Sequence, residues 1–209
     1  MTNGSGSKPT RALSPLEPFD PRPSVEAGAR VLEELGAHYA LIGGLALNAW
    51  GISRSTKDAD FAVPVGIAEV AAAKLGLRTI PLRIGGAGVR SESVAIDFID
   101  RRFYLAKLYG DAIEEARSSS RRTQVGSFEI PVVSLEYLVV MKLAPGEPKD
   151  DADLHRILEL EGLDYTRARE LTLAHHGLAT ANRLDAFARA AGRPEVSKKL
   201  YTSGDDPRE

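Results

Sequence analysis

Apolar residues recur along the chain with spacings that predict both helices and strands. From Val25 to Leu35 they lie three to four positions apart, which predicts a helix with one buried face. Ser24 is expected to cap this helix and Gly36 to end it. Helices are expected at 24–35, between the diglycine at 43–44 and the next strand, and at 67–75, 103–117, 134–143, 149–158, 166–175 and 179–191. Strands are expected at 38–42, around Asp58 and Asp60, at 77–84, at 89–99 and, as one or two short strands, within 125–133.

The two strands at 77–84 and 89–99 are expected to form a hairpin around the glycine turn at 85–88. Within the second strand, Asp97 is flanked by large apolar residues on a segment that otherwise belongs in a core. A charge in such a place needs a partner, because burying an unpaired carboxylate is costly. Asp97 is therefore a candidate functional residue.

Asp58 and Asp60 are two positions apart on a predicted strand. Successive strand side chains point to opposite faces, so these two carboxylates share a face while Ala59 and Phe61 point to the other. Adjacent anions repel each other, and a divalent cation that prefers oxygen ligands, such as Mg²⁺, offsets that repulsion. The pair therefore predicts a metal site.

Gly43 and Gly44 follow directly after the predicted strand at 38–42. Two glycines allow a sharp turn of the backbone, and the following helix presents free N–H groups suited to a phosphate. The sequence thus predicts a phosphate site next to the metal site.

Two groups of residues resemble a known family. The diglycine followed by Gly51-x-x-Arg54-x-Thr56-x-Asp58-x-Asp60 resembles the signature of the polymerase-β-like nucleotidyltransferases. The likeness is to the bacterial branch with AbiEii-type toxins and lincosamide and aminoglycoside nucleotidyltransferases. Lys142 with Lys149-Asp150-x-x-Asp153 resembles a second element of AbiEii-type proteins, in which Arg often stands where this chain has Lys149.

The resemblance implies a role for each of these residues. Asp58 and Asp60 would share Mg²⁺, with two ions expected, and Asp97 would complete the metal site and accept the proton of the acceptor hydroxyl. Lys142 would neutralise phosphate charge. The implied catalytic residues are Asp58, Asp60, Asp97 and Lys142, and the implied nucleotide-binding residues are Gly43, Gly44, Arg54, Thr56, Lys142 and Asp150.

Each assignment has a structural alternative. Asp58 and Asp60 would then be a strand-end pair that faces water, and Asp97 would pair with Arg90 or Arg101. Asp100 is another candidate carboxylate, but it lies near the strand end with the opposite parity. The remaining alternatives are a surface ion pair for Arg54, a turn cap for Thr56, an outward-reaching side chain for Lys142, and ordinary first-turn helix charges for Lys149, Asp150 and Asp153.

Composition narrows the classes of function. The chain has 209 residues, a formal net charge of -2 and no cysteine, which excludes disulfides, thiolate metal sites and cysteine catalysis. The near-neutral charge gives no case for avid, nonspecific nucleic-acid binding. No apolar run reaches membrane-spanning length and no signal peptide is recognisable, so a cytoplasmic protein is expected.

These observations predict an α/β (α+β) nucleotidyltransferase fold, with a mixed β-sheet flanked by helices and a helical C-terminal part. The expected segments are a flexible leader at 1–23, a catalytic core at 24–133, the helical part at 134–196 and a flexible tail at 197–209. The expected activity is Mg²⁺-dependent transfer of a nucleoside monophosphate from an NTP to tRNA or another RNA, as a toxin with a cognate antitoxin. The alternatives are an antibiotic-modifying nucleotidyltransferase with a small-molecule acceptor, or an inactive binding module.

Overall fold

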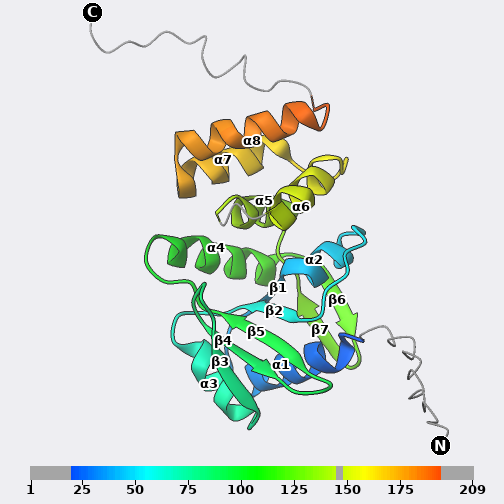
Figure 1. Cartoon of the computed structure of the whole chain (residues 1–209), viewed down its shortest axis with the longest axis vertical. Coiled ribbons are helices and arrows are strands. Elements are labelled where there is room, and N and C mark those ends of the chain that lie inside the picture. Colours follow the sequence, from blue (N-terminus) through cyan, green and yellow to red (C-terminus); the bar gives the residue numbers. More distant parts are fainter. Residues whose placement is uncertain (1–19, 145–147, 194–209) are drawn as a thin grey trace, which may run out of the picture.

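The structure is a computed structural model that describes residues 20–144 and 148–193. A five-stranded sheet forms its centre, and helices cover both faces (Figure 1). The helices are α1 (Arg22–Glu34), α2 (Gly43–Ala49), α3 (Ile67–Lys74), α4 (Tyr104–Ser118), α5 (Leu135–Leu143), α6 (Pro148–Leu158), α7 (Tyr165–His176) and α8 (Leu178–Ala190). The strands are β1 (Ala40–Ile42), β2 (Ala59–Ala62), β3 (Arg78–Pro81), β4 (Ala87–Arg90), β5 (Ala95–Ile99), β6 (Arg122–Val125) and β7 (Phe128–Pro131).

The sheet is mixed, with the strand order β1-β2-β5-β4-β3. The central strand β5 runs parallel to its neighbour β2. The other neighbouring pairs, β1 with β2, β3 with β4 and β4 with β5, are antiparallel. The register places Asp60 of β2 beside both Ile42 of β1 and Asp97 of β5. Acidic residues 37 positions apart in the sequence thus become neighbours.

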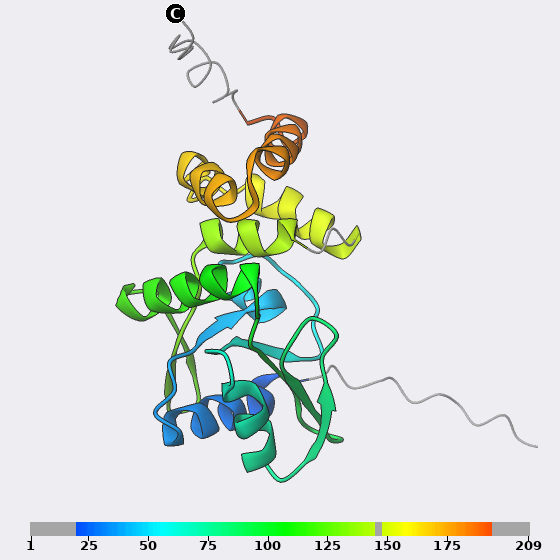
Figure 2. The same ribbon diagram turned by 90° about the vertical axis from the view of Figure 1, so that its left-hand side faces the viewer.

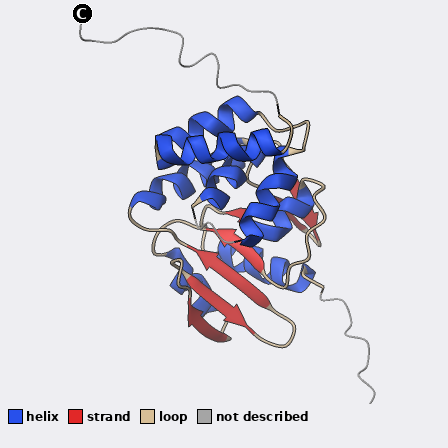
Figure 3. Ribbon diagram, turned by 45° about the horizontal axis from the view of Figure 1, so that its top comes forward, coloured by secondary structure: helices blue, strands red, loops and turns tan. Residues whose placement is uncertain are grey.

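The helices divide into two groups. In both Figure 1 and Figure 2, α1 and α3 lie on one side of the sheet, while α4 and the C-terminal helices lie on the other. Phe61 and Phe98 are fully buried in the sheet, where their rings stack with centroids 6.0 Å apart. The predicted fold class, a mixed sheet flanked by helices with a helical C-terminal part, is confirmed (Figure 3).

The C-terminal helices form as the apolar pattern predicts. Ser134 caps α5 by accepting a hydrogen bond from the backbone N–H of Tyr137. Nearly every residue of α5 is buried, in agreement with its apolar character all round. A buried ion pair, Arg169 Nε to Asp185 Oδ1 at 2.9 Å, joins α7 to α8. Among the described residues, no helix combines the length and apolar character that crossing a membrane requires.

Two predictions at element ends are wrong. Ser24 does not cap α1: the helix begins two residues earlier, at Arg22, and Ser24 is buried inside it. Its hydroxyl accepts a hydrogen bond from the backbone N–H of Ala95, 3.0 Å away, so it ties α1 to β5. Asp58 also lies just before β2 rather than on it.

The strand predicted at 89–99 is in fact two strands. β4 and β5 are separated by an exposed turn at 91–94, in which the N–H of Ser91 donates to the carbonyl of Val94 at 2.8 Å. The consecutive polar residues Ser91, Glu92 and Ser93 favour that turn over a continuous strand. The segment predicted at 125–133 forms β6 and β7, with β6 beginning three residues earlier than predicted. The expected leader up to residue 19, the loop at 145–147 and the tail from 197 lie outside the described residues.

Candidate active site

A cavity of about 260 Å³ lies between the sheet and helices α4, α5 and α6. This volume lies just below the range typical of small-molecule sites. Side chains from distant parts of the sequence meet there. Every site residue predicted from the sequence lines this cavity: Gly43, Gly44, Arg54, Thr56, Asp58, Asp60, Asp97, Lys142 and Asp150.

Three carboxylates form one wall of the cavity. Asp58, Asp60 and Asp97 each offer an oxygen, and these oxygens all lie within 4.8 Å of one another. Strand pairing brings them together, since Asp60 is in register with Asp97 and Asp58 precedes Asp60 by two residues. Oxygen atoms at this spacing suit a hard divalent cation such as Mg²⁺.

The electrostatics of the three acids favour a bound cation. Burial, followed by repulsion from Asp58 and Asp97, raises the pKa of Asp60 to about 8. Burial also raises the pKa of Asp97, although the hydrogen bond and charge of Arg90 oppose that effect. A divalent ion would relieve both the repulsion and the loss of solvation, so the residues present fit such an ion.

Among the described residues, Arg90 is the one basic side chain that forms an ion pair with this acidic wall. Its Nη2 lies 2.6 Å from Asp97 Oδ1 and 3.8 Å from Asp58 Oδ2. The alternative pairing of Asp97 with Arg90 is therefore real, whereas no described ion pair joins Asp97 to Arg101. When all three carboxylates are ionised, one arginine against them leaves a formal charge of -2, which a divalent cation would balance.

The diglycine shapes the acidic wall. Gly43 has φ +65°, and a Cβ there would lie 2.0 Å from Asp60 Oδ2, so no larger residue fits without displacing that carboxylate. A Cβ on Gly44 would lie 2.9 Å from the Cβ of Thr56. Thr56 in turn donates a hydrogen bond from Oγ1 to Asp58 Oδ1 at 3.0 Å. Gly43 therefore leaves room for Asp60, and Gly44 leaves room for the Thr56 side chain that fixes Asp58.

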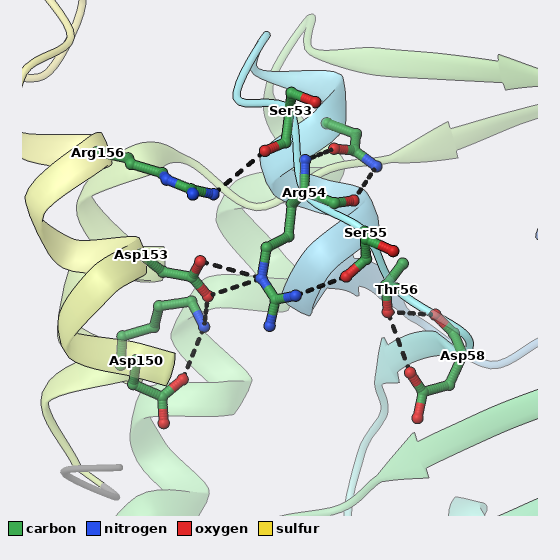
Figure 4. Close-up of polar contacts among 10 residues, drawn as sticks. Ser53, Arg54, Ser55, Thr56, Asp58, Asp150, Asp153 and Arg156 are labelled. Atoms are coloured by element: carbon green, nitrogen blue, oxygen red, sulfur yellow. Dashed lines mark hydrogen bonds and ion pairs between the residues drawn. The ribbon is translucent and has the colours of Figure 1, made fainter. Parts of the chain in front are cut away.

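A network of opposite charges forms the facing wall (Figure 4). Lys142 Nζ on α5 lies 2.8 Å from Asp150 Oδ1 and 2.7 Å from Asp153 Oδ2, both on α6. Arg54 Nε donates to Asp153 Oδ1 at 3.1 Å. Asn48 fixes the backbone of Arg54 by bonding both its N–H and its carbonyl. The partner of Arg54 is thus a buried acid, not a surface one.

Asp153 is a site residue to which the sequence assigned no role. Its side chain is 2% exposed and it joins Arg54 and Lys142, so it connects α6 to the segment before β2. Asp150 and Asp153 are both buried, which excludes ordinary solvated first-turn charges for these two. Only their place in the Lys149-Asp150-x-x-Asp153 pattern pointed to them.

Arg101 and Tyr109 also line the cavity and had no signal in the sequence. The guanidinium of Arg101 lies 5.7 Å from the centroid of the Tyr109 ring, and its Nη1 donates to the carbonyl of Ile84 at 2.6 Å. Burial raises the pKa of Tyr109. Asp100 lies elsewhere: it is fully buried and accepts a hydrogen bond from the N–H of Gly66 at 2.9 Å, as its opposite strand parity suggested.

No family model matches the chain, and no curated protein does. Among solved structures, the chain is similar to the solution structure of the antibiotic-resistance factor ANT(2'')-Ia, with 16% identity over 81% of this chain and 91% of that one and a TM-score of 0.42. A crystal structure of ANT(2'')-Ia in complex with adenylyl-2''-tobramycin matches with 13% identity over 82% and 96% and a TM-score of 0.42. An antigenic nucleotidyltransferase-like protein from Paracoccidioides brasiliensis matches with 14% identity over 77% and 92% and a TM-score of 0.41.

Proposed function

We propose that the protein is a divalent-metal-dependent nucleotidyltransferase that moves a nucleoside monophosphate from an NTP to an acceptor hydroxyl. The observation that carries this proposal is the cluster of Asp58, Asp60 and Asp97 in a cavity whose opposite wall presents Lys142. Nucleotidyl transfer needs little covalent participation from the protein, and depends on positioning and on stabilising phosphate charge. The cavity offers both.

In the proposed reaction, an oxygen of the acceptor bonds to the α-phosphorus while the bond to pyrophosphate breaks. Asp58, Asp60 and Asp97 would hold Mg²⁺, two ions by resemblance, which when bound neutralise the charge on the attacking and leaving oxygens. By resemblance, Asp97 would accept the proton of the acceptor hydroxyl as a general base.

The chain's remaining cavity residues would bind the triphosphate. Gly43 and Gly44 present backbone without side chains, so phosphates could approach it closely. Lys142 lies across the cavity and is 12% exposed, held by Asp150 and Asp153. We propose that its ammonium pairs with a phosphate oxygen while these acids keep it in place.

The direct test is incorporation of labelled NTPs into total tRNA in the presence of Mg²⁺, with a double Asp58→Ala/Asp60→Ala variant beside the wild type. We expect incorporation by the wild type and a loss of at least about a hundredfold in the variant, because the metal ligands are gone. No incorporation by the wild type would favour an inactive binding module, and equal incorporation by both proteins would rule out a catalytic role for these acids.

The biological setting is a further part of the proposal. A toxin paired with an antitoxin would arrest growth on induced expression, and the Asp58→Ala/Asp60→Ala variant would not. An antibiotic-modifying enzyme would instead protect cells against lincosamides or aminoglycosides. Growth with and without these antibiotics, measured for both proteins, distinguishes the two.

A further inference from the structure

Two exposed aromatic residues, Phe103 and Tyr104, follow the cavity-lining Arg101 closely in the chain, at the start of α4. They belong to a surface made by the end of β5, the start of α4 and the β3–β4 loop, which we term the aromatic–arginine rim. Its members are Arg83, Ile84, Arg101, Arg102, Phe103 and Tyr104. Ile84 and Arg101 line the cavity itself, and the Nη1 of Arg101 bonds the carbonyl of Ile84. Phe103 is two residues beyond Arg101, so their Cα atoms are within about 8 Å.

The rim exposes apolar surface that folding normally removes from water. Phe103 is 92% exposed, Tyr104 70% and Ile84 42%. Eight large apolar side chains of the described residues are exposed, and Phe103 and Tyr104 are the aromatic ones among them. Large apolar side chains left exposed on a segment that also supplies cavity residues are a candidate binding surface.

Phe103 is also held in a costly backbone conformation. Its φ is +56°. In the part of the chain that the structure describes, every other residue with positive φ is a glycine. A bulky residue rarely adopts this region, whereas glycine does so without cost. Neither its packing nor its backbone explains a phenylalanine here, so its ring is better explained by a ligand.

The charge of the rim is positive. Arg83 and Arg101 form no ion pair with a carboxylate among residues 20–144 and 148–193, while Arg102 pairs with Glu69 at 3.2 Å and Asp100 at 3.6 Å. Guanidinium groups without a carboxylate partner, on the same rim as exposed aromatic rings, suit a ligand that combines negative charge with flat rings. A polycationic aminoglycoside has neither property.

We propose that the aromatic–arginine rim binds a single-stranded nucleic acid and delivers its end to the cavity as the acceptor. Unpaired bases would stack on Phe103 and Tyr104, and phosphates would pair with Arg83 and Arg101, a combination typical of sequence-tolerant single-strand binding. The assignment of this strand as the acceptor rests on the proposed function. Unpaired bases on a phosphodiester backbone are common to RNA and DNA, so both are tested.

The test is fluorescence anisotropy with fluorescein-labelled 12-nucleotide strands, one of oligo-U RNA and one of oligo-dT DNA. Phe103→Ala/Tyr104→Ala is compared with the wild type and with the control variant Leu173→Ala/Leu178→Ala, which removes exposed apolar side chains of α7 and the start of α8. We expect affinity to fall about tenfold for each stacking ring removed. The control should bind as the wild type does. The strand that binds tighter identifies the acceptor class.

A second variant separates binding from folding. Phe103→Gly relieves the positive φ, so we expect it to raise Tm while it weakens binding of the same strands by about tenfold. A phenylalanine with a merely structural role would give a lower Tm on this substitution. A lower Tm with unchanged affinity would therefore overturn the proposal.

The response to nucleotide distinguishes this proposal from the proposed function. An equimolar mixture of the four NTPs with Mg²⁺ should raise Tm equally in the wild type and in Phe103→Ala/Tyr104→Ala, because the acidic wall is intact. If strand binding depends on the rim but NTPs give no shift, the binding surface stands and the transferase fails. If the wild type binds neither strand, or binds one equally well without the rings, the rim proposal is wrong whatever the NTPs do.

Discussion

The position of Asp60 suits cation binding but lowers the stability of the metal-free folded protein. Its pKa of about 8 lies far above the usual value of 3.8, chiefly because the carboxylate is buried beside two others. The unfolded chain therefore loses this proton near pH 4 and the folded one near pH 8. Stability without metal is lost progressively as the pH rises through that window. A cation that binds the ionised site reverses the loss.

We therefore expect Asp60→Asn to stabilise the metal-free protein at pH 8 while it abolishes the response to Mg²⁺. A gain of about 3 °C or more in Tm is expected, since 1 kcal/mol corresponds to about 2–4 °C in a chain of this size. The gain should shrink towards pH 4. Thermal melts in EDTA at pH 5 and pH 8 measure it.

Asp100→Asn is the matched control for this experiment. Asp100 is also buried, but it accepts a hydrogen bond from Gly66 and lies outside the cavity. Its substitution should not raise Tm and should leave the Mg²⁺ response unchanged. A melting temperature of Asp60→Asn at or below that of the wild type at pH 8 in EDTA would contradict the account.

A substitution at Gly43 tests whether the position of the Asp60 carboxylate depends on the diglycine. Gly43→Ala places a Cβ 2.0 Å from Asp60 Oδ2 at a φ of +65°, so the carboxylate must move. We expect nucleotidyl transfer to fall by about a hundredfold, because a displacement of about 1 Å at a reacting site costs that much. Gly51→Ala is the control, since Gly51 has φ +86° with nothing within 4 Å of a Cβ. Equal activity of the two variants would contradict the view that a Cβ at position 43 displaces the Asp60 carboxylate.

At the scale of elements, the residues predicted from the sequence were those with a local signal. Asp58 and Asp60 form an acidic pair two residues apart, although only Asp60 lies on β2, and Asp97 is a charge in an apolar strand, so each was recognisable from its neighbours in the chain. Arg101, Tyr109 and the ion pairs of Asp153 depend on which helix packs over the sheet. Local pattern carries no information on that packing, and these residues were missed for that reason.

The same limit explains the errors in the fold. The turn at 91–94 interrupts an apolar run of strand type, and Ser24 resembles a helix cap but is used inside α1 to bind Ala95. In both cases a tertiary contact or a short polar turn overrides the periodicity. Where the apolar pattern was long and regular, as in α4, α7 and α8, the helices form within about one residue of the predicted bounds.

The link between α6 and the segment before β2 gives a prediction at this scale. Asp153→Asn removes a carboxylate that holds both Arg54 and Lys142, and loss of one partner of a buried ion pair costs about 3–5 kcal/mol. We expect the lower end of this range, because Asp150 still pairs with Lys142. Urea unfolding at pH 7 measures the cost.

Asp151→Asn on the same helix is the control. Asp151 pairs with Arg183 at 2.7 Å, but both side chains are more than a third exposed. Surface pairs of this kind contribute at most about 1 kcal/mol. An equal cost for the two variants would mean that Asp153 has no special role in joining α6 to the site.

At the scale of the whole molecule, the cavity has walls from two groups of elements. The acids come from the sheet and the segment before β2, while Lys142, Asp150 and Asp153 come from α5 and α6. Neither group forms the site alone, and Ile84 and Arg101 of the aromatic–arginine rim also line the cavity. In the proposed function the triphosphate would lie between the two walls, and in the rim proposal the acceptor would enter along the rim.

Crystals soaked with Mn²⁺ and a non-hydrolysable NTP analogue test the central claim most directly. The account predicts an anomalous peak within about 2.0–2.6 Å of oxygens from Asp58, Asp60 and Asp97, with the triphosphate between this ion and Lys142. A structure with the analogue bound elsewhere, or with no cation between the three acids and Arg90 still paired to Asp97, would contradict it.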